Sequence, residues 1–205
     1  KIVVWGRTPV SRRGQWVADR SGAGLLTVED GFLRSMEPGV TGAPPVSLVL
    51  DDVGIYHDSS APSRLELLLN SIDLNVQNAD RARSALAALR AARLSKYTPP
   101  VRRRDVGTDH VLVVDQTAGD ASIAGAGADR GTFGRMLAAA RSENPGARII
   151  VKSHPDVQLG RKRGHVLASD LKNDEVLFSD AANPWDLIEG ARAVYTVSSQ
   201  LGYEA

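Results

Sequence analysis

Short apolar runs alternate with amphipathic segments along the chain, and each pattern predicts one kind of element. Apolar runs of strand length occupy residues 1–5, 25–29, 110–115, 148–152, 176–178 and 193–197. Helices are predicted over residues 11–19, 80–94, 133–141 and 184–189, and residues 80–94 place Ala and Leu on one face and Arg on the other. Because strands and helices alternate at short spacing, the sequence predicts an α/β fold built from parallel βαβ units.

Local signals mark two further elements in the first half of the chain. Ser63 and Glu66 have the spacing of a capping box, which predicts that a helix starts at residue 63. The apolar segments 47–52 and 55–57 flank the turn sequence Asp52-Val53-Gly54. We therefore expect these two segments to form a β-hairpin.

The pattern of alternating strands and helices is interrupted near residue 100 by a segment rich in proline and arginine. Tyr97-Thr98-Pro99-Pro100 is followed by three consecutive arginines, and the alternation of strand and helix then begins again. We predict an N-terminal α/β lobe over residues 1–98, a linker over 99–109 and a second α/β lobe over 110–205.

Composition narrows the class of protein without identifying it. The 205 residues include 25 Lys and Arg against 24 Asp and Glu, so the formal net charge is +1 and gives no electrostatic case for nucleic acid. The absence of cysteine excludes thiol catalysis and Cys-ligated zinc, and it fits a reducing cytoplasm. No apolar run reaches the roughly 20 residues of a membrane helix. The chain lacks an initiator Met and stops where a helix is predicted to begin, so we expect a piece of a longer protein.

Four polar clusters follow directly after predicted strands. In parallel α/β sheets, ligands bind at the carboxyl ends of strands, so these clusters are candidates for one shared cleft. Each cluster taken alone could equally be a capped turn. The clusters are residues 29–35, 115–122, 152–156 and 198–202.

Two clusters contain carboxylates that could act chemically. Glu29 and Asp30 are adjacent at a strand end, so only one of them can point into a cleft. Glu29 would act as a general acid or base if burial and its neighbour raised its pKa; otherwise Asp30 caps the turn and Glu29 is solvated. Asp120 follows Gly119 in a loop, where a carboxylate could attack an anomeric carbon.

The other two clusters suit a phosphate. Pro155 should hold His154 extended at a strand end, where the imidazole could donate to a phosphate with Lys152 nearby. Ser198 and Ser199 precede a predicted helix and either cap it or bind an anion there. A structural hydrogen bond remains the alternative for His154, and the other histidines, His57, His110 and His165, have no comparable setting.

Several known motifs are missing from the sequence. It has no Walker A sequence, G-x-G-x-x-G, G-x-S-x-G or H-E-x-x-H, and no D-x-D pair that would hold a metal on a sugar diphosphate. The basic runs 102–104 and 161–163 lack interleaved aromatic residues, so nucleic-acid stacking is not expected. A role for them at a membrane surface or on an anionic acceptor stays open.

Taken together and in order, the segments resemble the bacterial capsule polysaccharide export/biosynthesis family of KpsC/LipA type, the retaining β-Kdo glycosyltransferases. The resemblance runs nearly end to end. The residues that carry it are Trp5-Gly6, 29–35, 47–52, 54–56, 63–66, 115–122, 152–156 and 195–205.

This resemblance implies a GT-B-like pair of Rossmann-type lobes, the second apparently truncated, and CMP-β-Kdo as donor without a metal or other cofactor. It also implies a Kdo-lipid acceptor of lysophospholipid type and a cytoplasmic location, peripheral on the inner membrane and associated with capsule assembly. Family members continue beyond the equivalent of Ala205, so this piece could be inactive alone.

The resemblance also implies roles for individual residues. Asp120 would be the nucleophile, and Glu29, beside Asp30, the acid/base or acceptor activator. The His154-Pro155 pair resembles the HP element that bacterial sialyltransferases use on the CMP phosphate. Ser198 and Ser199 would complete the nucleotide site, and the candidates for the Kdo carboxylate or hydroxyls are Arg34, Ser35, Gln116 and Lys152.

Two other functions remain open at this point. Another GT-B-fold enzyme, such as a sugar-nucleotide epimerase acting on a uridine nucleotide, would share much of this pattern. A non-catalytic binding or assembly module of the capsule machinery would keep the fold without the chemistry.

Overall fold

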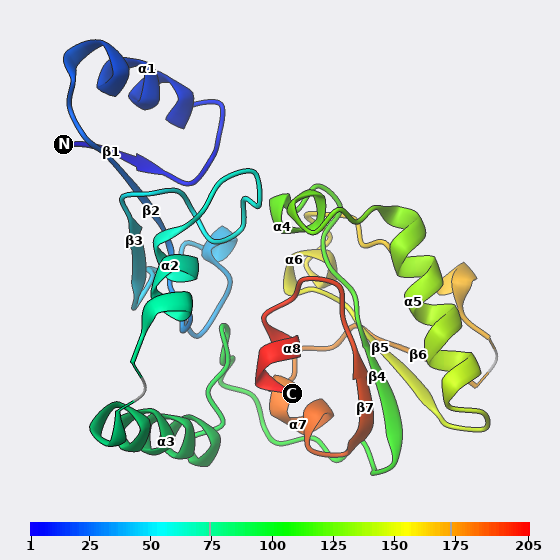
Figure 1. The fold of residues 1–205 in the computed structure, drawn as a ribbon. Coiled ribbons are helices and arrows are strands. Elements are labelled where there is room, and N and C mark those ends of the chain that lie inside the picture. Colours follow the sequence, from blue (N-terminus) through cyan, green and yellow to red (C-terminus); the bar gives the residue numbers. More distant parts are fainter. Residues whose placement is uncertain (74, 173) are drawn as a thin grey trace. The chain divides into compact units, whose positions relative to one another are not determined.

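Two compact α/β units make up the computed structural model, which describes residues 1–73, 75–172 and 174–205 (Figure 1). The first unit contains residues 1–34 and 44–96, and the second contains 35–43 and 97–205. The sequence predicted one break near residue 100, but segment 35–43 groups with the second unit. There Ser35 forms a β-bridge with Tyr97, and its carbonyl accepts a hydrogen bond from the backbone N–H of Thr98 at 3.1 Å.

The first unit is built on a three-stranded sheet in the order β1-β2-β3. The strands are β1 (Ile2–Trp5), β2 (Leu25–Asp30) and β3 (Leu48–Asp51). β1 and β2 are parallel, as predicted, and β3 runs antiparallel to β2. Helix α1 (Ser11–Ser21) packs on β1, with Gly14 in close contact with the side chain of Val4.

The predicted hairpin over residues 47–57 is wrong. β3 pairs with β2 instead, and residues 55–57 form no strand. The carboxylate of Asp51 explains the difference, because Oδ1 accepts the backbone N–H groups of Val53 and Gly54 at 2.8 and 2.7 Å. Its Oδ2 accepts the backbone N–H of Arg64 at 2.9 Å. The buried side chain thus turns the chain toward the next helix rather than into a second strand.

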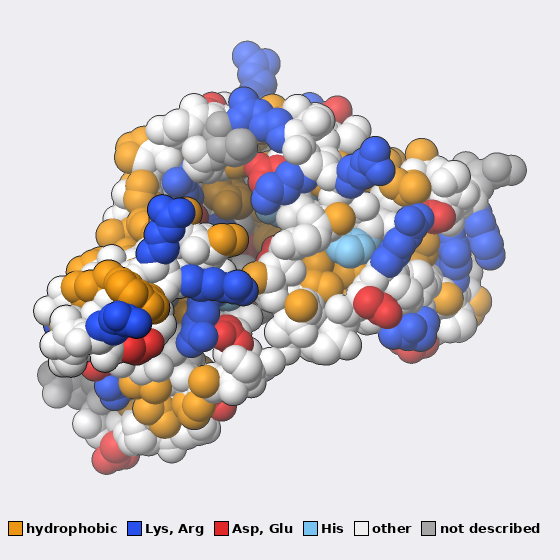
Figure 2. Space-filling model, turned by 90° about the horizontal axis from the view of Figure 1, so that it is seen from above, with side chains coloured by type: hydrophobic (Ala, Val, Ile, Leu, Met, Phe, Trp, Pro, Cys, Tyr) orange, Lys and Arg blue, Asp and Glu red, His pale blue; other side chains and the backbone are white. Residues whose placement is uncertain are grey.

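Two helices follow in the first unit, α2 (Arg64–Ser71) and α3 (Val76–Ala91). Ser63 caps α2 by accepting the backbone N–H of Glu66 at 3.1 Å, which confirms the predicted helix start. None of the described residues of α2 and α3 is buried within the chain. The exposed hydrophobic side chains of the first unit include Leu48, Leu50, Leu68 and Leu69. Figure 2 shows groups of hydrophobic side chains on the face of the molecule that it draws.

The second unit is built on a parallel four-stranded sheet in the order β6-β5-β4-β7. Its two central strands are fully buried and consist almost entirely of aliphatic residues, as expected for a sheet covered on both faces. The strands are β4 (His110–Val114), β5 (Ile149–Lys152), β6 (Val176–Phe178) and β7 (Ala191–Tyr195).

Helices cover both faces of this sheet. On one face, Phe133 and Leu137 of α5 pack against Val111 and Val113 of β4. On the other face, Leu187 of α7 packs against Leu112 of the same strand. The helices are α4 (Ala121–Gly125), α5 (Arg130–Glu143), α6 (Pro155–Gln158), α7 (Pro184–Ile188) and α8 (Leu201–Glu204), with 3-10 turns at Gly39–Thr41 and Ala168–Asp170.

The strand order creates a topological switch point in the second unit. From β4 the chain goes to β5 and β6 on one side and then returns to β7 on the other side of β4 (Figure 1). Loops that leave neighbouring strands in opposite directions open a crevice at their carboxyl ends, where α/β proteins bind ligands. A ligand-binding site is therefore expected at the carboxyl ends of β4 and β7. None of the helices in the described ranges is long and apolar enough to cross a membrane.

Candidate functional site

Gln116 and Ser198 join the two loops at the switch point. Gln116 follows β4 and is 3% exposed, and Ser198 follows β7. The side-chain Oε1 of Gln116 accepts the backbone N–H of Ser198 at 3.0 Å, and its Nε2 donates to the Ser198 hydroxyl at 3.0 Å. Two of the predicted site residues, 82 positions apart, are therefore directly hydrogen-bonded to each other.

Asp120 lies at the N-terminus of α4, in the same loop as Gln116. Its Oδ1 accepts the backbone N–H of Ser122 at 3.0 Å and the Ser122 hydroxyl at 2.9 Å. Both hydrogen bonds from Ser122 therefore reach the same carboxylate oxygen, Oδ1. Gly119 has a φ of +85°, so a glycine there lets the loop turn just before Asp120.

Ser122 connects Asp120 with the Gln116–Ser198 pair. Its hydroxyl lies 3.0 Å from the hydroxyl of Ser198 and 3.5 Å from Nε2 of Gln116. The structure therefore brings three predicted residues into one hydrogen-bonded group: Asp120, Gln116 and Ser198. Ser122 lies within the predicted polar cluster 115–122, although no separate role was predicted for it.

Asp115, which opens the same polar cluster, has a structural role. It is 2% exposed, and its Oδ1 accepts the backbone N–H groups of His165 and Val166 at 3.1 and 3.3 Å. Burial raises the pKa of Asp115, and these backbone hydrogen bonds oppose the rise. The close approach of Gly164 to this carboxylate leaves no room for a Cβ.

His154 is held in the extended conformation that Pro155 was predicted to impose, with φ −67° and ψ 145°. It caps α6, and Nδ1 accepts the backbone N–H of Asp156 at 3.1 Å. An Nδ1 that accepts a hydrogen bond leaves the ring proton on Nε2, so Nε2–H is the donor this ring can offer. The ring also meets Tyr97 edge to face, with 6.3 Å between the centroids.

Lys152 is a buried cation rather than an exposed one. It is 7% exposed, and Nζ donates to the carbonyl oxygen of Ser153 at 3.2 Å. Burial lowers the pKa of Lys152 to about 8, against the opposing effect of Glu204. Ser199 caps the turn before α8, since its hydroxyl accepts the backbone N–H of Leu201 at 3.3 Å.

The first unit contains a second group of predicted residues around Glu29. Nε2 of His57 lies 3.6 Å from Oε2 of Glu29, and the backbone N–H of Asp30 donates to Oε1 at 3.0 Å. Burial alone would raise the pKa of Glu29, but the hydrogen bond from His57, the backbone of Asp30 and the charges of His57 and Lys96 together lower it. The rise in pKa that the acid/base reading of Glu29 required is not found, because the pKa lies below its ordinary value.

His57 was not among the predicted site residues, because no comparable sequence setting surrounds it. Its contact with Glu29 joins positions 28 residues apart in the sequence. The adjacent Tyr56 ring contacts the His57 ring edge to face at 5.4 Å. Only the tertiary course of the chain after β3 reveals the contact with Glu29.

Gly6 is the other neighbour of Glu29. A Cβ at this position would lie 2.7 Å from Oε2 of Glu29, and the backbone has a φ of +53°. Glycine is needed here both for the left-handed conformation and for the close approach of the carboxylate.

Asp30 and Arg34 form a separate pair. Nε of Arg34 lies 3.2 Å from Oδ1 of Asp30, and Arg34 is 7% exposed. The two adjacent carboxylates thus have different partners: Glu29 lies beside His57, and Asp30 pairs with Arg34. Ser35 belongs to the second unit, where its hydroxyl donates to the carbonyl oxygen of Glu37.

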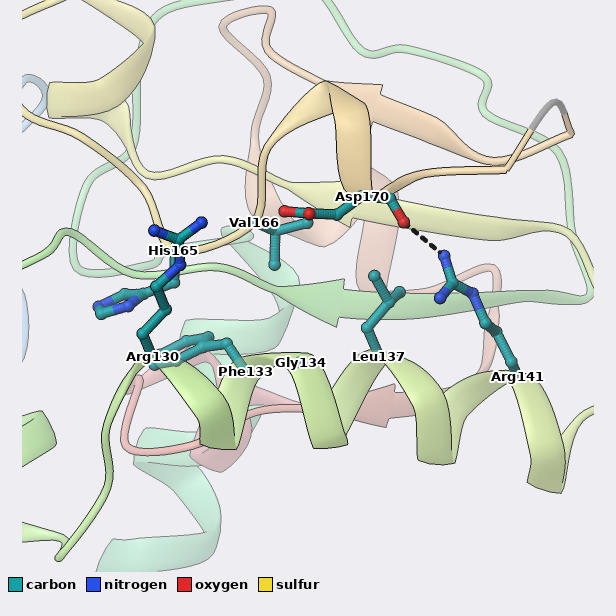
Figure 3. A pocket seen from close by; sticks show the side chains of 8 residues that line it. All are labelled: Arg130, Phe133, Gly134, Leu137, Arg141, His165, Val166 and Asp170. Atoms are coloured by element: carbon teal, nitrogen blue, oxygen red, sulfur yellow. Dashed lines mark hydrogen bonds between the residues drawn. The ribbon is translucent and has the colours of Figure 1, made fainter.

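A cavity of about 260 Å³ lies elsewhere in the second unit, between α5 and the segment that follows α6 (Figure 3). Arg130, Phe133, Leu137 and Arg141 line it from α5, and the guanidinium of Arg141 donates to the carbonyl oxygen of Asp170 at 2.8 Å. None of the residues predicted to form the site lines this cavity.

In the described part of the chain, no group of three or more His, Cys, Asp or Glu residues is arranged to hold a metal ion. The hydrogen-bonding side chains that the structure joins at the ends of β4 and β7 include the Gln116 amide and the hydroxyls of Ser122 and Ser198, all of which are neutral. Such groups suit a ligand that is bound by hydrogen bonds.

The family of the chain follows from comparison with known proteins. The model of the family described as "Capsule polysaccharide biosynthesis protein" matches residues 1–100 and 81–205, which together span the chain. The chain therefore belongs to this family.

Curated relatives match the whole chain. The capsule polysaccharide modification protein LipA of Neisseria meningitidis serogroup A is 38% identical over 215 residues, and the lipopolysaccharide-processing protein LpsZ of Rhizobium meliloti is 37% identical over 216 residues. The chain covers 30% of the first protein and 48% of the second.

Two solved structures from Thermosulfurimonas dismutans match as well. The KpsC β-Kdo 2,4 transferase aligns with a TM-score of 0.88 and 40% identity, covering 98% of this chain and 64% of the other. The KpsC β-Kdo 2,7 transferase aligns with a TM-score of 0.60 and 29% identity, covering 94% and 56%. The predicted GT-B-like α/β fold class is confirmed.

Proposed function

We propose that this chain is part of a retaining β-Kdo glycosyltransferase that uses CMP-β-Kdo as donor and Asp120 as nucleophile. One observation carries the proposal: the Asp120 carboxylate is held after β4, at the switch point of the second unit, in a chain 40% identical to a β-Kdo 2,4 transferase. A carboxylate in that position can trap the oxocarbenium-like state that forms when a Kdo nucleotide is cleaved.

The reaction proceeds in two displacements. In the first, a carboxylate oxygen of Asp120 bonds to C2, the anomeric carbon of Kdo, while the bond from C2 to the phosphate oxygen breaks and CMP leaves with the electron pair. In the second, an acceptor hydroxyl oxygen bonds to C2, and the ester bond to Asp120 breaks. Two inversions restore the configuration of the donor.

Glu29 takes the proton of the acceptor hydroxyl in this scheme. Its lowered pKa keeps the carboxylate ionised at neutral pH, as a general base requires. A general acid would need the opposite shift. The contact with His57 therefore favours acceptor activation over protonation of the leaving group.

Hydrogen-bond donors of the second unit stabilise the departing CMP phosphate. His154 supplies Nε2–H, because its Nδ1 already accepts the backbone N–H of Asp156. A phosphate monoester leaving group can be stabilised by such donors, so we propose that no metal ion is needed.

We further propose O4 of an acceptor Kdo as the hydroxyl that is extended. The chain resembles the KpsC β-Kdo 2,4 transferase more than the 2,7 transferase both in identity and in TM-score. We expect that acceptor to be carried on a lipid and the reaction to take place at the cytoplasmic face of the inner membrane, where a water-soluble nucleotide meets a membrane-bound acceptor.

Incubation of the full-length protein with CMP-Kdo and a synthetic Kdo-lipid tests the proposal. Mass spectrometry should find one added Kdo, and NMR should assign a β-linkage from C2 to O4. Product with the α-configuration would contradict a retaining mechanism, and a C2–O7 linkage would contradict the O4 assignment alone.

The two rival functions make different predictions in the same experiments. A uridine-nucleotide epimerase would be stabilised against heat by UDP and not by CMP, whereas the proposed enzyme is stabilised by CMP. A non-catalytic capsule-assembly module would consume no CMP-Kdo even when the full-length protein is supplied with the lipid acceptor.

A further inference from the structure

We propose that Ser198 and Ser122 are positioning residues for Asp120, joined by a one-directional hydrogen-bond chain that begins at Gln116 and ends on Oδ1. The inference rests on the proposed nucleophilic role of Asp120. It assigns Gln116 and Ser198 a role other than direct binding of the donor, which the family resemblance implied for them.

The donor-to-acceptor direction of this hydrogen-bond chain follows from the groups at its two ends. An ionised carboxylate only accepts, so the Ser122 hydroxyl, 2.9 Å from Oδ1 of Asp120, must donate to it. At the other end, Oε1 of Gln116 accepts the backbone N–H of Ser198 at 3.0 Å, which fixes the orientation of the amide. Its Nε2 therefore faces the Ser198 hydroxyl and donates to it at 3.0 Å.

The remaining question is which hydroxyl donates in the hydrogen bond between Ser122 and Ser198. Only one choice of donor is consistent with all the short hydrogen bonds in the group. The Ser122 proton is committed to Asp120, so Ser122 Oγ accepts from the Ser198 hydroxyl across 3.0 Å. The competing arrangement, in which the Ser198 hydroxyl donates back to Oε1 of Gln116, spans 3.4 Å. The shorter contact favours a proton order that runs from Gln116 through Ser198 and Ser122 to Asp120.

This hydrogen-bond chain connects the proposed nucleophile, Asp120, with the loops after both β4 and β7. Asp120 and Ser122 lie after β4, whereas Ser198 lies after β7, and Gln116 is buried between them. Two donors from Ser122, its hydroxyl and its backbone N–H, hold Oδ1. The carboxylate rotamer is fixed in this way, and the other oxygen is the one that approaches C2 of Kdo.

A residue that fixes a nucleophile acts on the chemical step rather than on binding. A small misplacement of the attacking atom lowers the rate without removing any contact to the donor. Loss of a hydrogen bond in a chain that ends on a charged group typically corresponds to a rate decrease of about tenfold or more. Direct nucleotide binding by Ser198 would instead raise KM for CMP-Kdo.

The test uses the full-length protein carrying Ser198→Ala, Ser198→Thr or Ser122→Ala. Ser198→Ala and Ser122→Ala should lower kcat at least about tenfold and leave KM for CMP-Kdo within about twofold. Ser198→Thr keeps the hydroxyl and should restore most of kcat. The matched control is Ser142→Ala, which removes an exposed hydroxyl that bonds only to Ala139 of α5 in the described structure.

Each outcome decides between defined alternatives. Wild-type kcat in Ser198→Ala, or a change confined to KM, would overturn the positioning role and leave the proposed function intact. Ser122→Ala removes only the hydroxyl and keeps the backbone N–H on Asp120, so it remains informative if Ser198→Ala fails to fold. A wild-type protein that forms no product would overturn the proposed function and the positioning role with it.

Discussion

Nε2 of His57 lies 3.6 Å from Oε2 of Glu29, a carboxylate that is partly withdrawn from solvent beside the positive-φ turn at Gly6. This relationship determines which proton-transfer role Glu29 can take. Burial raises the pKa of Glu29, and the contributions of His57, the Asp30 backbone and Lys96 outweigh it. Removing any of the lowering contributions should therefore move the pKa upward.

Replacing His57 by Gln should move the acid limb of the kcat/KM profile of the full-length protein to higher pH. Burial of Glu29 remains while the main charged partner is lost, so Glu29 is protonated at a higher pH and the base form is lost earlier on acidification. Lys96→Met should shift the limb in the same direction but less, since Lys96 is the smallest of the contributions. An acid limb that does not move in His57→Gln would contradict the base role of Glu29.

Gly6→Ala should reduce activity more than its effect on stability explains. The new Cβ would lie 2.7 Å from Oε2 of Glu29 at a φ of +53°. Gly22→Ala is the matched control, because its φ is +66° and no atom lies within 4 Å of the added Cβ. Each substitution should cost about 1–2 kcal/mol of unfolding free energy for the left-handed backbone. Only Gly6→Ala should lower kcat; equal kcat values in the two variants would refute the contact with Glu29 as the reason for this glycine.

Lys152→Met should stabilise the protein, and the gain should depend on pH. The pKa of Lys152 is about 8 in the folded protein against 10.5 unfolded, so the unfolded chain binds more protons between these values. The wild type therefore gains stability as pH rises through this window. At pH 7 the variant should be more stable by roughly 3 kcal/mol, and the difference should shrink toward pH 10.5.

Thermal unfolding of both proteins between pH 7 and 10.5 measures this difference. The carbonyl oxygen of Ser153 keeps a donor in the variant, since Nε2 of Gln158 also bonds to it at 3.2 Å. Lys162→Met, at a side chain that is 51% exposed, is the control and should show no comparable gain at pH 7. A gain that stays constant across the pH range would rule out a buried ammonium as its cause.

The elements predicted correctly are those whose signals are local. Ser63 caps a helix because its hydroxyl reaches a backbone N–H three residues along the chain, and Pro184 begins α7 because its ring fits only the first turn. The aliphatic run of β4 could belong only to a buried strand. In each case the cause of the structure lies within one turn or one strand of sequence.

The errors come from contacts between distant parts of the chain. Segment 47–52 was expected to pair with 55–57 in a hairpin, but the carboxylate of Asp51 accepts a hydrogen bond from the backbone N–H of Arg64, 13 residues away. The contact between His57 and Glu29 likewise joins residues that are distant in the sequence. The arginines of the run 102–104 are exposed, as a basic surface run is expected to be, and Arg103 and Arg104 pair at the surface with Glu189 at 2.9 Å and Asp180 at 2.8 Å.

The candidate residues were identified through family resemblance, but their relations were not visible in sequence. Strand ends predicted that Gln116 and Ser198 belong to polar clusters, and the parallel sheet places both at one edge. That they bond to each other, and through Ser122 to Asp120, depends on the return of the chain from β6 to β7. Spacing along the chain carries no information on such a contact.

The covalent role of Asp120 is the central claim, and a trapped intermediate tests it most directly. The full-length protein is incubated with CMP-Kdo without acceptor, digested and analysed by mass spectrometry. Asp120→Asn is the informative variant because an amide oxygen can still accept the backbone N–H of Ser122, and Asp129→Asn, at the N-terminus of α5, is the matched control.

The wild type and Asp129→Asn should both release CMP and carry one Kdo residue on the peptide that contains Asp120. Asp120→Asn should form neither the adduct nor the transferred product. An Asp120→Asn protein that transfers Kdo at the wild-type rate, or an adduct on a different residue, would contradict the account.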